Sequence, residues 1–322
     1  MRDADLRGTS SGGGRLPLVL AMRLTFADYF RYFSDVCRIT GGWIILLAVI
    51  IGAANAFKWS WAAWIFERFK AGDLHYAGVY PYISMALYLL MAMLLMLACV
   101  DVAVAWHRRI LLSELPGWPG SCFAANRGWQ YLALILLLSC ATVLVTAAIV
   151  GAASADFDDY LPEYELSPIW DNLIGIAVAL AVFITGPALF VRLALVLPAR
   201  AIGDTDLTLI RSGKATRGST WRLLIGGGCL IVIPSLFGQV VHYLFGTDPL
   251  RQTLGDLFNK ETFPKGEWLE AAGLQIAAAL ALLSIPLYAG FLSHSYRHLI
   301  RRSPGDAIGE GCNPRGGAAG SV

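Results

Sequence analysis

The sequence is poor in charged side chains. Asp, Glu, Lys and Arg make up 15% of its 322 residues, against about 25% in an average soluble domain, whereas apolar residues make up 57%. So little polar surface excludes an ordinary water-soluble domain. The formal net charge is only +2, and no basic run is interleaved with aromatic residues, so we expect no nucleic-acid partner.

The sequence also lacks the common motifs of catalysis and metal binding. It contains no GxxxxGK[ST], HExxH or GxSxG pattern and no Rossmann glycine fingerprint, which argues against an enzyme. Its six cysteines form no CxxC pair and read as small core residues. His294 and His298 are four residues apart and could hold a metal, but no third ligand is evident, so we expect no metal and no cofactor.

The beginning of the sequence shows no cleavable signal peptide, because its one early apolar run, 16–22, is short. Residues 1–21 include the stretch GTSSGGG and are expected to form a disordered tail. A second disordered tail is expected over 303–322, and a single membrane domain over 22–302.

Apolar residues are gathered in six blocks. Most of these blocks approach or exceed the roughly 20 residues of helix that cross a hydrocarbon core. The predicted spans are 43–57, 82–106, 131–153, 169–191, 223–243 and 269–291. No alternating pattern of a β-barrel is present. The expected fold is therefore an all-α polytopic bundle of about six transmembrane helices, with the lipid bilayer as its surroundings.

Basic residues are distributed unevenly between the two ends of these spans. The N-terminal region, the loops after the second and fourth spans and the C-terminal tail hold 19 Lys and Arg, whereas the other three loops hold 6. The positive-inside rule then places both termini in the cytoplasm. Arginine accounts for 20 of the 25 basic residues, which points to a GC-rich bacterium and so to its inner membrane.

An amphipathic segment precedes the first span. Over 26–37 aromatic residues recur at helical spacing, with charged residues on the opposite face. Thr25 followed by Asp28 resembles a capping box. We expect an N-terminal helix that lies in the interface or packs against the bundle.

Similar sequences recur around the spans. Trp43, Trp129 and Trp221 precede the odd-numbered spans, and Arg108, Arg192 and Arg297 follow the even-numbered ones in matching places. This pattern favours three pseudo-repeated helical hairpins of similar direction. The shared chemistry of the membrane interface explains much of it without common ancestry.

Asp101 is a carboxylate inside the second span, where a charge must face protein rather than lipid. Arg192 lies at a similar depth at the end of the fourth span, so we expect an ion pair between Asp101 and Arg192, with Arg297 as the competing partner. A hydrogen-bonded structural carboxylate and a proton or ion relay are the two broader roles open to Asp101.

Helix-breaking residues occur in the later spans. Pro187, Pro234 and Pro286 fall in the last three, and glycines fill positions 226–228. Such breaks can expose backbone carbonyls around a transport site, or they can be plain kinks and close-packing points.

Three segments carry a family resemblance. AWHRRILLSE after the second span, RLALVLPARA after the fourth and KATRGSTWRLL before the fifth resemble bacterial inner-membrane proteins similar to the membrane domain of glycerophosphoryl diester phosphodiesterases. In that family catalysis belongs to a separate soluble barrel domain with a His-Arg-Gly motif. The chain has neither, so the resemblance does not imply lipid hydrolysis.

Two functions therefore remain. The first is a non-enzymatic scaffold or accessory factor of the cell envelope, whose protein partner the sequence does not name. The alternative is a small-solute or lipid transporter in which Asp101 has an ion or proton role.

Overall fold

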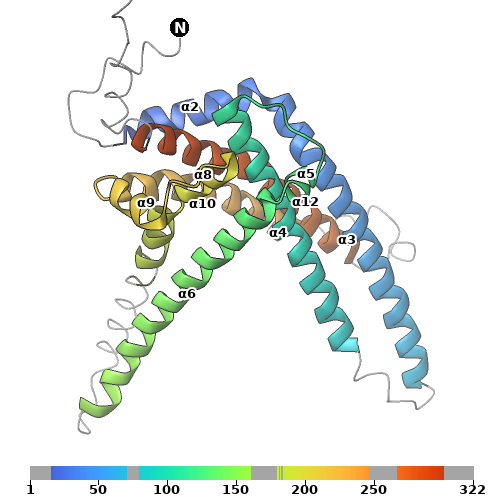
Figure 1. Cartoon of the computed structure of the whole chain (residues 1–322). Helices are drawn as coiled ribbons and strands as arrows, with labels where there is room; N and C mark the ends of the chain where they lie inside the picture. The colour runs from blue at the N-terminus through green and yellow to red at the C-terminus, as the bar shows by residue number, and fades with distance from the viewer. Residues whose placement is uncertain are drawn as a thin grey trace, which may run out of the picture.

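The computed structural model describes residues 16–70, 80–160, 184–246 and 267–300, together with residues 180 and 182. Every regular element among them is an α-helix, so the predicted all-α fold is confirmed. The labelled helices are α2 (Leu18–Arg31), α3 (Phe33–Lys70), α4 (Tyr80–Leu112), α5 (Ser121–Ala124), α6 (Arg127–Tyr160), α8 (Val196–Ile202), α9 (Leu209–Ala215), α10 (Thr220–Gly246) and α12 (Glu267–Leu299) (Figure 1).

Five helical segments in the described part of the chain are long and apolar enough to cross a membrane. They are Phe33–Ala54, Met85–Leu112, Arg127–Val150, Ile184–Ile202 and Gln275–Leu299. Each overlaps one predicted span, which makes the chain a multi-pass membrane protein. The predicted span 223–243 falls within α10, a helix of 27 residues, some of whose side chains lie outside the described set.

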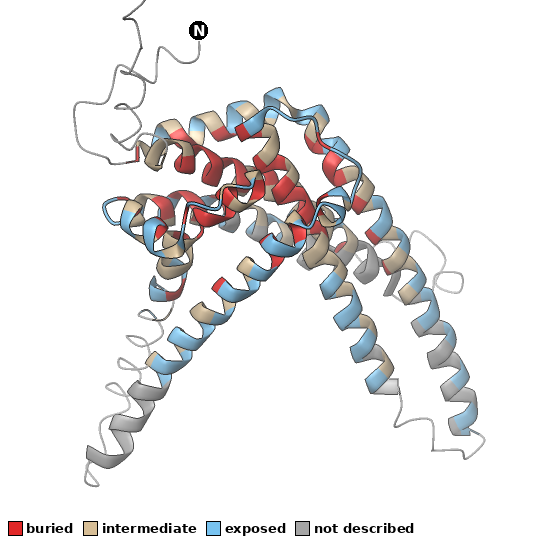
Figure 2. Ribbon diagram, viewed as in Figure 1, coloured by how far each residue is buried: buried red, intermediate tan, exposed pale blue. Residues whose placement is uncertain are grey.

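Buried residues are concentrated at one end of the molecule, here called the basic-rich end because the loops rich in Lys and Arg lie there. Figure 2 shows α8 and the adjoining ends of α4 and α12 largely buried, whereas the far halves of α3, α4 and α6 diverge and are mostly exposed where their side chains are described. Many of the exposed side chains of these far halves are apolar, for example Leu89, Val143 and Leu144. Apolar surface of this kind suits lipid contact.

The N-terminal helix differs from the prediction in both position and length. It begins at Leu18, and Leu16 before it is fully buried, so residues 16–21 are not part of a disordered tail. The predicted helix 26–37 is divided at Tyr32, beyond which α3 starts and runs on through the first span. Thr25 lies inside α2, where its hydroxyl donates to the Ala21 carbonyl, and therefore caps nothing. The tails 1–15 and 303–322 fall outside the described residues.

The three prolines do not interrupt their helices. Pro234 and Pro286 lie inside the continuous helices α10 and α12, and Pro187 lies within helical residues 184–193. A break occurs instead at residues 194–195, just before α8. Ser212 of α9 donates to the Arg192 carbonyl at 2.8 Å, which satisfies a backbone acceptor beside the break.

Glycine permits the close approach of α10 and α12, which pack along each other. A Cβ atom built at Gly226 would lie 2.5 Å from the Phe291 ring and 2.7 Å from Leu18 of α2. Phe291 is fully buried, so a methyl group at Gly226 would press on a packed ring. In the same helix, a Cβ at Gly228 would meet nothing within 4 Å.

The different surroundings of Gly226 and Gly228 predict opposite effects of a Gly→Ala substitution on the stability of the protein. Gly226→Ala should destabilise the protein by about 1–3 kcal/mol, because overpacking a filled core forces the neighbours apart. Gly228→Ala is the matched control and should be neutral or stabilising by up to about 1 kcal/mol, since alanine favours helix. Thermal unfolding in detergent measures both, and equal shifts for the two variants would contradict the packing described here.

Candidate functional site

Asp101 lies inside the bundle, only 3% exposed, and holds three segments together. Its Oδ2 accepts hydrogen bonds from the Trp43 indole of α3 and from the backbone N–H of Gly120, each at 2.8 Å. Gly120 has φ of +82°, in the left-handed region that glycine tolerates. Burial first, and then hydrogen bonding to Asp101, raise the pKa of the Cys122 thiol, so this thiol stays protonated beside the carboxylate.

The predicted ion pair between Asp101 and Arg192 is wrong. Arg192 donates instead to the Gly213 carbonyl at 3.3 Å, and every described partner of Asp101 is a neutral donor. Arg297, which donates to the Ile110 carbonyl at 2.7 Å, is not among the described partners of Asp101 either. Of the two roles left open for Asp101, its surroundings favour the hydrogen-bonded structural carboxylate.

A cavity of about 660 Å³ lies elsewhere, between α4, α6, α10, α12 and the residues around the break before α8. This is the size of ordinary ligand pockets, roughly 300–1,000 Å³. None of its sixteen described lining residues is charged, and most are apolar, among them Ile135, Phe190 and Leu197. Lining residues on α4, α6 and α12 belong to the candidate membrane spans, so the cavity lies at membrane depth.

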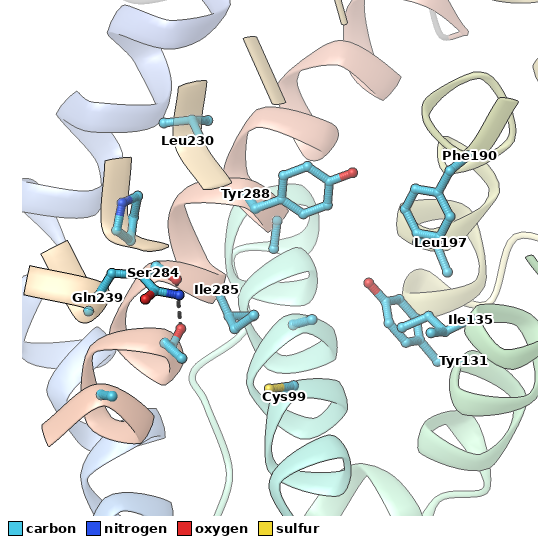
Figure 3. Close-up of a pocket in the computed structure, with 16 residues that line it drawn as sticks. Cys99, Tyr131, Ile135, Phe190, Leu197, Leu230, Gln239, Ser284, Ile285 and Tyr288 are labelled. Atoms are coloured by element: carbon cyan, nitrogen blue, oxygen red, sulfur yellow. Dashed lines mark hydrogen bonds between the residues drawn. The ribbon is translucent and has the colours of Figure 1, made fainter. Parts of the chain in front are cut away.

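Two tyrosines form a polar end to this cavity. Figure 3 shows Tyr288 of α12 and Tyr131 of α6 extending toward the space between their helices. The Tyr131 hydroxyl lies 3.0 Å from His107 Nε2, and His107 Nδ1 lies 2.7 Å from the Ser293 hydroxyl. The Tyr288 hydroxyl is buried and has no hydrogen-bond partner in the described structure.

The proton positions in this network follow from counting donors. Ser293 has one hydroxyl proton and donates it to the Ala289 carbonyl at 2.9 Å, so it accepts from His107 Nδ1. A neutral imidazole then accepts at Nε2, which assigns the Tyr131 proton to His107. Of the two tyrosines at this end, Tyr288 is the one that keeps an unused donor.

The two histidines considered for a metal lie away from this cavity. His294 Nε2 is 3.1 Å from the Asp28 carboxylate of α2. Within the described part of the chain, no three His, Cys, Asp or Glu residues gather in a way that could hold a metal ion.

The fold and the cavity define a class: an all-α, multi-pass membrane protein with an uncharged, largely apolar cavity that has two tyrosines at one end. Comparison with protein-family models, curated proteins and solved structures finds no match to this chain. The resemblance to phosphodiesterase membrane domains therefore stays a prediction.

Sequence reasoning singled out none of the residues that form the polar end. Tyr131 was the first residue of a predicted span, and Tyr288 stood inside another. His107 directly precedes Arg108 and Arg109 and follows the last residue of the predicted span 82–106. The available signal was His107 itself, a neutral polar residue at the end of an apolar block, which must find partners when buried.

The Asp101 contacts predict a non-additive mutant pair. Asp101→Asn should destabilise the protein by about 1–3 kcal/mol, because it offers poorer acceptors to buried donors. Trp43→Phe removes one of those donors, so the double variant should lose at least about 0.5 kcal/mol less than the sum of the singles. Thermal and denaturant unfolding in detergent measure these losses.

Two controls accompany this cycle. Trp129→Phe alters a half-exposed indole and should add independently to Asp101→Asn, as should Arg192→Gln. Additivity between Asp101 and Trp43, or coupling between Asp101 and Arg192, would show that the carboxylate has a different partner.

Proposed function

We propose that this chain is a non-enzymatic protein of the bacterial inner membrane that holds the acyl chain of a lipid in the cavity between α4, α6, α10 and α12. It would act as an accessory factor of the cell envelope. The observation that carries this proposal is an uncharged chamber of about 660 Å³ among membrane-spanning segments.

The filling of such a chamber follows from what surrounds it. An apolar void does not hold water, and an empty one forfeits the dispersion contacts of its walls. In a bilayer the nearest molecules are lipids, whose chains match an uncharged lining. An acyl chain is therefore the occupant best supported by the position and chemistry of the cavity.

The transport alternative has less support from the described residues. It rested on Asp101 as an ion or proton site, but Asp101 is not among the residues that line this cavity. Its carboxylate is engaged by Trp43, Gly120 and Cys122. Prolines that leave their helices continuous also remove one reason for expecting a transport path.

Filling the cavity should exclude the lipid. Ala281 of α12 lines the cavity, and Ala281→Phe should lower the fraction of purified protein that retains a lipid several-fold, measured by native mass spectrometry. Ala53→Phe places the same ring on an exposed position of α3 and should leave retention unchanged. Equal retention in both variants, with both folded by circular dichroism, would reject the cavity as the lipid site.

The orientation is a second part of the proposal. The asymmetry of 19 to 6 basic residues supports a cytoplasmic location for the basic-rich end and both termini. Reporters fused after Tyr160, at the end of α6, and at the C-terminus should report opposite compartments. A truncation fusion after Leu115 should agree with the C-terminal one, and one compartment for all three would refute this topology.

A further inference from the structure

We infer that the cavity selects lipids whose acyl chain begins at a carbonyl oxygen, because the unpartnered hydroxyl of Tyr288 is placed to donate a hydrogen bond to it. The inference rests on the proposed lipid site and adds the chemical class of its ligand. It names an ester-linked lipid, with Tyr288 as the residue that recognises the ester.

Apolar contacts cannot supply this selection. A hydrocarbon chain gains little free energy of transfer when it moves from the bilayer into an apolar cavity, because lipid tails are as apolar as the lining. Chains of different lipids are therefore almost equivalent to Ile135, Phe190 and Leu197. Only a polar contact can separate one lipid class from another here.

The polar end offers one unused donor, and it belongs to Tyr288. Tyr131 donates a hydrogen bond to His107, His107 donates to Ser293, and Ser293 donates to the Ala289 carbonyl, so each of these three donors is used. Tyr288 makes no such bond, although its hydroxyl oxygen is buried. A buried hydroxyl without a partner is costly, and a ligand oxygen would remove that cost.

The absence of charge among the described lining residues also restricts the chemical class of the ligand. With no charged residue among the described lining residues, neither a phosphate nor an ammonium group would find a counter-charge inside. A neutral acceptor at the head of a hydrocarbon chain fits both features. The ester carbonyls of glycerolipids have this chemistry, and they occur both in phospholipids and in diacylglycerol.

The test uses the full-length protein in detergent with pairs of lipids that differ only in the carbonyl. Dioleoylphosphatidylethanolamine competes with its ether-linked analogue, and in a parallel arm dioleoylglycerol competes with its ether-linked analogue. Native mass spectrometry gives the ratio of the two bound lipids. The wild-type protein should retain the ester about fivefold over the ether, which is the preference expected from one neutral hydrogen bond.

Tyr288→Phe keeps the ring and removes the hydroxyl, so the ratio should fall to about one while total retention persists. Tyr29→Phe is the matched control, because the Tyr29 hydroxyl donates to the Leu283 carbonyl outside the lining residues, and the fivefold ratio should remain. Preference in the phospholipid arm alone or in the diacylglycerol arm alone would support the inference and identify the source of the ester.

Three results would overturn the inference. Both lipids bound equally by the wild type, or a preference unchanged in Tyr288→Phe, would reject ester recognition by Tyr288 while leaving the lipid site standing, provided that Ala281→Phe still lowers retention. No retention of either lipid would reject the lipid site and the ester recognition together.

Discussion

The carboxylate of Asp101 must be satisfied by protein, because hydrocarbon offers it no partner. The structure meets this constraint with an indole from α3, a backbone N–H from the chain before α5 and a neutral thiol from α5 itself. A single acceptor thus fixes α3 against α4 and draws the chain that follows α4 back onto it. The core of the basic-rich end is assembled around this point, and the same helix α4 carries Cys99 and Ala103 into the cavity wall.

Backbone carbonyls near breaks and helix ends also need hydrogen-bond donors from the protein. Arginine side chains supply these donors. Arg108 donates to the Ala201 carbonyl, Arg192 to Gly213 and Arg297 to Ile110. These are the three arginines that recur at matching places after the even-numbered spans. Their equivalence is therefore one of chemistry: each ends a span and binds an acceptor on a neighbouring segment. The tryptophans are not equivalent, since Trp43 is buried against Asp101 whereas Trp129 and Trp221 are exposed.

Hydropathy predicted the all-α fold and the approximate spans, because a bilayer requires long apolar helices whatever their neighbours. It could not predict the partner of Asp101. Helical spacing gives the depth of a residue but not the direction in which the helix turns it, and neither an indole nor a backbone N–H is marked by a charge pattern. The start of α2 was missed for a related reason: the run LPLVLAM was too short for a span, yet Leu16 and Ala21 are buried by α2 packing on α10 and α12.

The cavity could not be predicted from sequence, because it is made by the divergence of helices that are each apolar all round. The two tyrosines at one end of the cavity differ in their hydrogen bonding, although nothing in the sequence separates them. Tyr131 has its proton committed to His107, so it belongs to the buried network that ties α4, α6 and α12 together. Tyr288 has no described partner, and its hydroxyl stabilises nothing within the described fold. The Tyr288 hydroxyl therefore keeps a donor that no described group uses, and the ester recognition proposed above rests on this donor and on its place beside the cavity.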